Sequence, residues 1–226
     1  MQQGKALVIL SGGQDSTTCL YWALQNFNQV TTLSFDYNQR HKVELESAQQ
    51  IAALANVPNE VISLGPVFAG LSPLTNPFEH VEKYQDADTL PGGLEKTFVP
   101  GRNILFLTIA ANRAYTLGCS HMVIGISQED FGGYPDCRAE FITAMEKALN
   151  LGLDAQLTIA MPLVHLNKKQ TVELALTLPG CMEALALSHT CYEGQTPPCG
   201  KCHACLLRER GFREAGIPDP ILRNVA

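Results

Sequence analysis

Short apolar runs alternate with amphipathic stretches along most of the chain. Helices are predicted at 16–26, 41–55, 103–117 and 138–151, and the third of these is apolar enough to be buried. The apolar runs between them have the length and composition of buried strands: ALVIL (6–10), TTLSFDY (31–37), EVISL (60–64), HMVIGI (121–126) and QLTIAMPL (156–163). This alternation predicts an α/β fold in which a parallel sheet is covered by helices.

Two segments depart from the alternation. Prolines, glycines and charges interrupt every period in the interval 65–97, which we interpret as an excursion or an active-site flap. After Pro179 and Gly180 the composition changes to cysteine, proline and glycine. We therefore expect one main domain over 1–180 and a small C-terminal subregion over 181–226, packed on it.

Composition narrows the classes of function. The chain has 226 residues, 46% of them hydrophobic and 17% charged, which suits one α/β domain with a substantial core. The formal net charge of −6 disfavours an extended contact with nucleic acid, so we expect no direct nucleic-acid partner. No signal peptide and no run of about 20 apolar residues is visible, and we expect a cytoplasmic enzyme with no membrane contact.

The first predicted strand runs into the stretch SGGQDSTTCL, which opens a helix. A glycine turn at a helix N-terminus presents backbone N–H groups and a favourable dipole to an anion. A carboxylate at Asp15 would approach phosphate only with Mg²⁺ between them. The alternative interpretation is an ordinary turn with serine and aspartate caps. The candidate nucleotide-binding residues are Leu10, Ser11, Gly12, Gly13, Gln14, Asp15, Ser16 and Thr17.

Four of the eight cysteines lie close together near the C-terminus, in CYEGQTPPCGKCHAC. Clustered cysteines in a reducing compartment more often bind metal than form disulfides. Four thiolates complete a tetrahedral Zn²⁺ site with no open position, which favours one structural zinc over an iron–sulfur cluster or redox-active thiols. His203 in place of one cysteine is a less economical alternative. The predicted ligands are Cys191, Cys199, Cys202 and Cys205.

Two further motifs offer groups for a second ligand. FVPGRN (98–103) brings Arg102 and Asn103 to a predicted helix N-terminus, where arginine can bind a phosphate or a carboxylate in a bidentate manner. QEDFGGYPDCR (128–138) follows the fourth predicted strand and offers an aromatic ring and carboxylates, with Asp130 among the latter. Alternatively, Arg102 caps a surface helix and Asp136 caps the helix that begins near Arg138. The candidate substrate contacts are Phe98, Arg102, Asn103, Tyr134, Asp136 and Arg138.

SGGQDS resembles the loop of the PP-loop, or N-type, ATP pyrophosphatases, and the likeness implies a doubly wound, mostly parallel five-stranded sheet. It also implies that ATP is cut between its α- and β-phosphates, so that the loop holds the departing pyrophosphate without a lysine of its own. In this family a lysine follows the last strand in the pattern P-L-x-x-L-x-K, which PLVHLNKK (162–169) fits with Lys168. From composition alone, Lys168 and Lys169 could equally be solvated lysines that open a helix after Asn167.

The motifs taken in order resemble the 7-cyano-7-deazaguanine synthase family over nearly the whole chain. That likeness implies a ligase of queuosine biosynthesis, which converts 7-carboxy-7-deazaguanine and ammonia to a nitrile and releases AMP and pyrophosphate. It further implies ATP with Mg²⁺, structural zinc, a homodimer, and catalytic roles for Asp15, Lys168 and Arg102. The domain 1–180 would then bind ATP, and the subregion 181–226 would bind zinc.

Other functions remain open at this point. A PP-loop tRNA sulfurtransferase shares the loop and some cysteines, but it would need a basic surface for tRNA. A NAD or GMP synthetase would also use ammonia, although the cysteine cluster has no obvious place there. A nucleotide-sensing or zinc-ribbon interaction module would bind ATP without releasing pyrophosphate.

Overall fold

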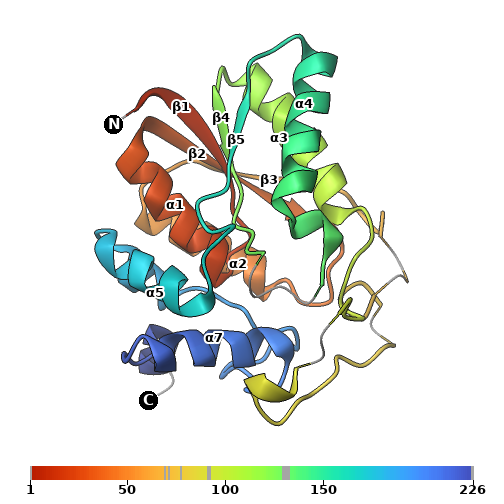
Figure 1. Cartoon of the computed structure of the whole chain (residues 1–226), viewed down its shortest axis with the longest axis vertical. Helices are drawn as coiled ribbons and strands as arrows, with labels where there is room; N and C mark the ends of the chain where they lie inside the picture. The colour runs from red at the N-terminus through yellow and green to blue at the C-terminus, as the bar shows by residue number, and fades with distance from the viewer. Residues whose placement is uncertain are drawn as a thin grey trace.

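A five-stranded parallel sheet forms the centre of the computed structural model, which describes residues 2–68, 70, 72–76, 78–90, 93–128 and 133–224. The strand order is β3-β2-β1-β4-β5 (Figure 1). The strands are β1 (Gln2–Ile9), β2 (Phe27–Asp36), β3 (Asn59–Ser63), β4 (His121–Val123) and β5 (Thr158–Ala160). The predicted α/β fold with a parallel sheet is confirmed.

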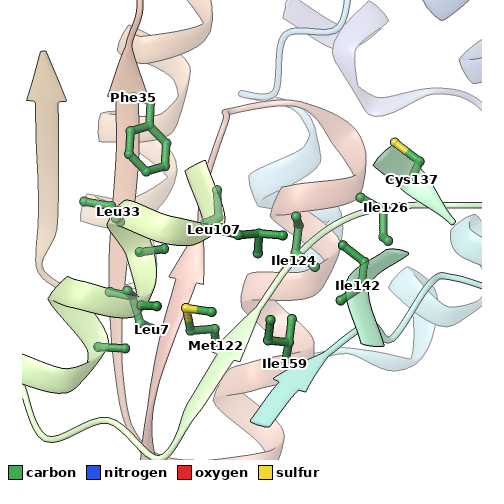
Figure 2. Packing of buried hydrophobic residues seen from close by; sticks show 14 of the residues in the cluster. Leu7, Leu33, Phe35, Leu107, Met122, Ile124, Ile126, Cys137, Ile142 and Ile159 are labelled. Carbon is green, nitrogen blue, oxygen red and sulfur yellow. The ribbon is translucent and has the colours of Figure 1, made fainter. Parts of the chain in front are cut away.

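Helices cover both faces of the sheet. One face packs on α3 (Arg102–Thr116) and α4 (Ala139–Leu153), and Figure 2 shows Leu107 and Ile142 of these helices among strand residues such as Leu7 and Met122. The other face buries Ala6, Val8 and Val123. It packs on α1 (Gln14–Asn26), α2 (Val43–Leu54), α5 (Lys168–Thr177), α6 (Cys181–Leu185) and α7 (His203–Glu214). The sheet is therefore doubly wound, as the resemblance implied.

The four helices expected from the sequence are present, but two predicted strands are longer than the observed ones. β4 and β5 have three residues each, whereas 121–126 and 156–163 were predicted. Beyond Val123 the backbone turns toward α1: a Cβ at Gly125 would lie 2.8 Å from the backbone nitrogen of Ser16. Regular pairing therefore stops where the chain must reach the first turn of α1.

The C-terminal helices share a core with the sheet. Figure 1 shows α5 and α7 side by side, and the two helices are in contact. Cys181 and Leu185 of α6 and Phe212 of α7 belong to the hydrophobic cluster that also contains Val8 of β1. The C-terminal region thus packs on the α/β part, and a domain boundary at residue 180 stays a prediction.

The predicted excursion between β3 and α3 contains one short helix, η1 (Ala87–Thr89), within its described residues. Asp86 caps η1, and its carboxylate accepts hydrogen bonds from the backbone N–H groups of Asp88 and Thr89. The excursion lies against the start of α7, where the Tyr84 N–H donates to the carbonyl of Lys201 (2.9 Å) (Figure 1). None of the helices in the described part of the chain has the length and hydrophobicity of a membrane-spanning segment.

Gly12 is the described glycine at which an added Cβ would lie closest to another atom. Its φ is +88°, and a Cβ there would lie 2.1 Å from the carbonyl oxygen of Glu44 in α2. We expect Gly12→Ala to lower the free energy of unfolding in urea by about 3 kcal/mol or more, through crowding and backbone strain together. Gly65→Ala is the control, because its φ is +61° and nothing lies within 4 Å of an added Cβ. Gly65→Ala should lower the free energy of unfolding by about 1 kcal/mol. Equal losses of stability in the two variants would contradict a close contact at Gly12.

Candidate functional site

A cavity of about 280 Å³ lies at the carboxyl ends of three strands. Ile9 of β1, Phe35 of β2 and Ile124, which follows β4, all line it. β1 and β4 are neighbours at the point where strand order reverses. Open α/β sheets bind ligands at this switch point because the adjacent loops diverge there.

The glycine loop forms one wall of this cavity. Ser11, Gly13 and Ser16 hold it in shape: the Ser11 N–H donates to Ser16 Oγ (3.2 Å), and the Gly13 N–H donates to Ser11 Oγ (3.3 Å). Leu10, Ser11, Gly13, Gln14, Asp15 and Ser16 line the cavity. The first turn of α1 therefore points its N-terminus into the cavity, as an anion site requires.

Gly12 and Thr17 do not line the cavity, and both support the loop from behind. The Gly12 carbonyl accepts a hydrogen bond from the His189 N–H (2.8 Å), which ties the loop to the C-terminal region. The Thr17 hydroxyl is fully buried and donates to the Gly13 carbonyl (2.8 Å). Their expected contribution to nucleotide binding is thus one of loop geometry.

Lys168 reaches the loop from the other end of the chain. Its Nζ lies 2.7 Å and 2.6 Å from the two carboxylate oxygens of Asp15. Asn167 caps α5 by accepting a hydrogen bond from the Gln170 N–H (2.9 Å), so Lys168 is the first residue of a helix, as the alternative interpretation predicted. The same lysine nevertheless lies in the cavity, whereas Lys169 is exposed and pairs with Glu173 at 3.5 Å.

Arg102 lies on another part of the cavity wall, at the first position of α3. Burial lowers the pKa of its guanidinium, but the nearby Tyr37, Tyr134, Cys137 and Asp136 outweigh burial and raise the pKa above the ordinary value. Within the described part of the chain no carboxylate forms an ion pair with Arg102. Arg102 is therefore a positive charge available to an anionic ligand.

Of the other candidate substrate contacts, Asn103 and Tyr134 line the cavity. Asp136 instead supports the start of α3: its carboxylate accepts from the Asn103 N–H (3.3 Å), while the Asn103 side chain donates to the Asp136 carbonyl (3.1 Å). Burial raises the pKa of Asp136. The ring of Phe98 packs on that of Tyr134, with centroids 5.5 Å apart.

Arg138 is not brought to the site. Arg138 is exposed at the N-cap of α4 and is not among the residues that line the cavity. Asp130 lies outside the residues that the structure describes.

Sequence reasoning missed several residues of the cavity, chiefly Glu44, Tyr37, His189 and Tyr192. Glu44 lies in the first turn of α2, and burial raises its pKa to about 7. His189 is buried, which lowers its pKa, and its Nε2 has no hydrogen-bond partner among the described residues. The only signal for Glu44 and Tyr37 was their place just after the second strand, where parallel sheets position ligands.

The four clustered cysteines converge as the spacing predicted. One sulfur from each of Cys191, Cys199, Cys202 and Cys205 lies within 4.8 Å of the other three. The N–H of Cys202 donates to the sulfur of Cys199 (3.3 Å), the kind of contact that stabilises a thiolate. His203 is engaged elsewhere, because its Nδ1 lies 3.1 Å from the buried carboxylate of Glu95. The arrangement fits a metal ion with four sulfur ligands.

The fold and the site together define a PP-loop type of α/β nucleotide-binding protein with a four-cysteine cluster suited to a metal ion. Comparison with known proteins identifies the family. The family model of queuosine biosynthesis protein QueC matches residues 5–216. The chain belongs to the QueC family, and the family recognised from the motifs is confirmed.

The chain aligns with two curated relatives over almost their whole length. The chain is 54% identical to a 7-cyano-7-deazaguanine synthase of Laribacter hongkongensis, over 98% of this chain and 95% of the relative. It is 53% identical to the synthase of Gloeobacter violaceus, over 96% of this chain and 95% of the relative. A 4-thiouridine synthetase solved with RNA and bound ATP is similar in fold, with a TM-score of 0.52 and 15% identity, over 97% of this chain and 52% of the synthetase.

Arg208 of α7 holds the segment that brings His189 and Thr190 to the cavity. It is 4% exposed and donates hydrogen bonds to Asp219 (2.6 and 2.8 Å), Ser188 (2.8 Å) and Thr190 (2.9 Å). Removing one partner of a buried ion pair leaves the other charge uncompensated. We expect Arg208→Met to lower the free energy of unfolding in urea by about 3 kcal/mol or more.

The control for Arg208 is Arg213→Met on the same helix. Arg213 pairs with Glu209 at 2.7 Å, but both side chains are more than half exposed. That loss should stay below about 0.5 kcal/mol. Similar losses in the two variants would show that the Arg208 network does not stabilise this region.

Proposed function

We propose that this protein converts 7-carboxy-7-deazaguanine and ammonia to 7-cyano-7-deazaguanine, with cleavage of ATP to AMP and pyrophosphate. Membership of the QueC family and the names of its relatives support this reaction. The single observation that carries the proposal is the approach of Lys168 to Asp15 beside the glycine loop, in one cavity at the switch point.

In this proposal ATP binds with its phosphates against the glycine loop and the N-terminus of α1. Lys168 supplies the positive charge that the loop itself lacks, and it leaves Asp15 to meet a phosphate oxygen. The pairing of Lys168 with the carboxylate of Asp15 keeps its charge compensated until the nucleotide arrives. Asp15 is then free to hold Mg²⁺, which would neutralise phosphate charge.

The carboxylate of 7-carboxy-7-deazaguanine is a poor electrophile, so it must first be activated. Its oxygen attacks the α-phosphorus of ATP, pyrophosphate leaves, and an acyl adenylate forms. Ammonia displaces AMP to give an amide. A second ATP would then adenylate the amide oxygen, and that oxygen leaves with AMP while the two N–H protons are lost and the nitrile forms. We infer that the chain acts by positioning and electrostatic stabilisation rather than through a covalent enzyme intermediate.

The acceptor would bind beside Arg102, Asn103 and Tyr134, which line the cavity. Arg102 would receive the reacting carboxylate, since its guanidinium has no carboxylate partner among the described residues. Tyr134 would provide an aromatic surface for the base. Phe98 and Asp136 would act indirectly, by packing on Tyr134 and by holding Asn103.

We further propose that the metal of the four-cysteine site is zinc and that its role is structural. The donor set supports this identity, because four thiolates complete a tetrahedral zinc site. Two copies of the chain would associate through exposed apolar side chains such as Ile104, Tyr115 and Leu151 on α3 and α4. The resemblance to the family supports a homodimer in the cytoplasm.

A PP-loop tRNA sulfurtransferase is the second candidate, because the 4-thiouridine synthetase shares the fold. The net charge of −6 opposes it, as does the burial of Cys19, Cys137 and Cys181, whose pKa values are raised by desolvation. A catalytic thiol needs the opposite shift.

The reaction can be tested directly with Mg-ATP, ammonium chloride and 7-carboxy-7-deazaguanine. We expect AMP, pyrophosphate and the nitrile, separated by liquid chromatography and identified by mass. Lys168→Met should lower kcat/KM for ATP by about 10²-fold, because it removes charge from the leaving pyrophosphate. Lys169→Met, next to it but exposed, should stay within about twofold. Release of ADP and phosphate would overturn cleavage between the α- and β-phosphates.

The metal can be tested by elemental analysis of the purified protein, with one zinc expected per chain. Cys199→Ala should lose that zinc and lower the free energy of unfolding by about 3 kcal/mol or more, because metal binding contributes to folding. Cys119→Ser, at a buried cysteine away from the cluster, should keep the zinc. Full stability and activity in zinc-free protein would contradict a structural zinc.

A further inference from the structure

Glu44 is a cavity residue to which the reaction described so far gives no task. Of the described residues that line the cavity, Asp15 and Glu44 are the acids. Asp15 is paired with Lys168 at 2.6 Å. The Glu44 side chain makes no hydrogen bond or ion pair with any described residue, although it lies in a partly buried position. A carboxyl group without a partner in a cavity is a group available to a ligand.

The backbone fixes Glu44 relative to the glycine loop. Its carbonyl oxygen lies so close to Gly12 that a Cβ there would approach it to 2.1 Å, and the next turn, at Ala48, is 2.9 Å from that same point. Ala48 and Ile51 anchor α2 in the core beside β1. The backbone of Glu44 therefore cannot move away from the glycine loop without displacing a buried helix.

The charges around Glu44 differ from those around Asp15. Burial raises the pKa of Glu44 to about 7, the positive charge of Arg102 opposes that rise, and Cys191 adds to it. Tyr37 also lies near Arg102 and Glu44: burial raises the pKa of Tyr37, the positive charge of Arg102 opposes that rise, and Glu44 adds to it. The cavity thus has a phosphate end at Asp15 and Lys168, and an acceptor end at Arg102, Tyr37 and Glu44.

We propose that Glu44 binds ammonium at the acceptor end and accepts its proton, so that neutral ammonia is produced beside the activated carboxylate. This inference rests on the proposed function. Arg102 carries the anionic reactant, so a carboxylate beside Arg102 lies near the carbon that ammonia must attack. A small cation fits an unpartnered carboxyl group whose ionised form burial makes costly, because the cation restores the lost stabilisation.

The step is balanced in atoms and protons. Ammonium gives one proton to the Glu44 carboxylate and becomes ammonia, whose lone pair forms a C–N bond with the acyl carbon. The C–O bond to AMP breaks, and AMP leaves with that electron pair. The remaining excess proton on nitrogen passes to water, and Glu44 returns its proton to solvent before the next turnover.

A magnesium ligand is the main competing role for Glu44. Asp15, on the loop itself, is already placed for that role beside Lys168, whereas the cation that acts on the pKa of Glu44 is Arg102. A metal held by Glu44 would therefore have the positive charge of Arg102 beside it. The arrangement favours a monovalent, proton-donating cation.

Glu44→Gln separates these roles, because adenylation needs no ammonia. The exchange of labelled pyrophosphate into ATP, with 7-carboxy-7-deazaguanine and without ammonium, should stay within about twofold of the unaltered protein. Amide and nitrile formation should fall by about 10²-fold in kcat/KM for ammonium chloride. Glu46→Gln is the matched control, since Glu46 is an exposed acid in the same first turn of α2. It should change neither activity.

Hydroxylamine provides the readout that a structural role would not move. It is uncharged at neutral pH, so it needs neither a carboxylate to bind it nor a proton acceptor to free its lone pair. Glu44→Gln should therefore form the hydroxamate at a rate within about fivefold of the unaltered protein. Glu44→Asp, which keeps a shorter carboxylate, should recover part of the activity with ammonium.

Three outcomes would overturn this role of Glu44. Loss of pyrophosphate exchange in Glu44→Gln would assign Glu44 to adenylation, magnesium or folding. Equal losses with ammonium and hydroxylamine would assign it to positioning of the acyl group, and unchanged use of ammonium would remove it from the reaction. If the unaltered protein shows no exchange and no nitrile, the proposed function itself has failed, which is a distinguishable result.

Discussion

Backbone segments from three distant parts of the chain pack directly on the glycine loop and the first turn of α1. The carbonyl of Glu44 lies over Gly12, Gly125 packs against the first turn of α1, and the His189 N–H donates to the Gly12 carbonyl. A side chain at either glycine would meet backbone atoms that cannot yield. Because interiors are close-packed, these contacts fix α2, the end of β4 and the C-terminal region on one loop. The cavity lies between these segments, and residues of each of them line it.

The charges of the cavity are separated by the same geometry. Lys168 and Asp15 come from helices on one face of the sheet, and they neutralise one another beside the loop. Arg102 begins α3, which packs on the opposite face, so its charge enters the cavity from the other side. An anion bound at the loop and an anion bound at Arg102 therefore each meet a positive charge of their own. A doubly wound sheet produces this separation because the two sets of helices approach the switch point from opposite faces.

Local signals predicted the parts of the structure that depend on a few neighbouring residues. The strand before SGGQDS, the helix after FVPGRN and the convergence of four cysteines all follow from patterns within about 20 residues. The resemblance to a family, rather than periodicity, brought Lys168 to the loop. Glu44 escaped notice because a carboxylate in the first turn of an amphipathic helix also suits a solvated face. Its burial depends on how closely α2 lies on Gly12, which no local pattern records.

Asp136 illustrates a structural role that the sequence did not indicate, and its predicted contact with substrate stays a prediction. Its position after β4 agreed with a ligand contact, yet its carboxylate accepts the N–H of Asn103 at the start of α3. The first N–H groups of a helix need acceptors, and Gly101 at the N-cap of α3 has no side chain to offer one. The residue that caps α3 must therefore come from elsewhere, and Asp136 meets that need.

The metal site and the cavity are parts of one wall rather than separate regions. Cys191 stands between Thr190 and Tyr192, and Cys202 directly precedes His203 and Ala204. All four of these neighbours line the cavity. Whatever holds the four sulfurs together also fixes the backbone that presents these side chains. A metal bound to these four sulfurs would for that reason also help to determine the shape of the cavity.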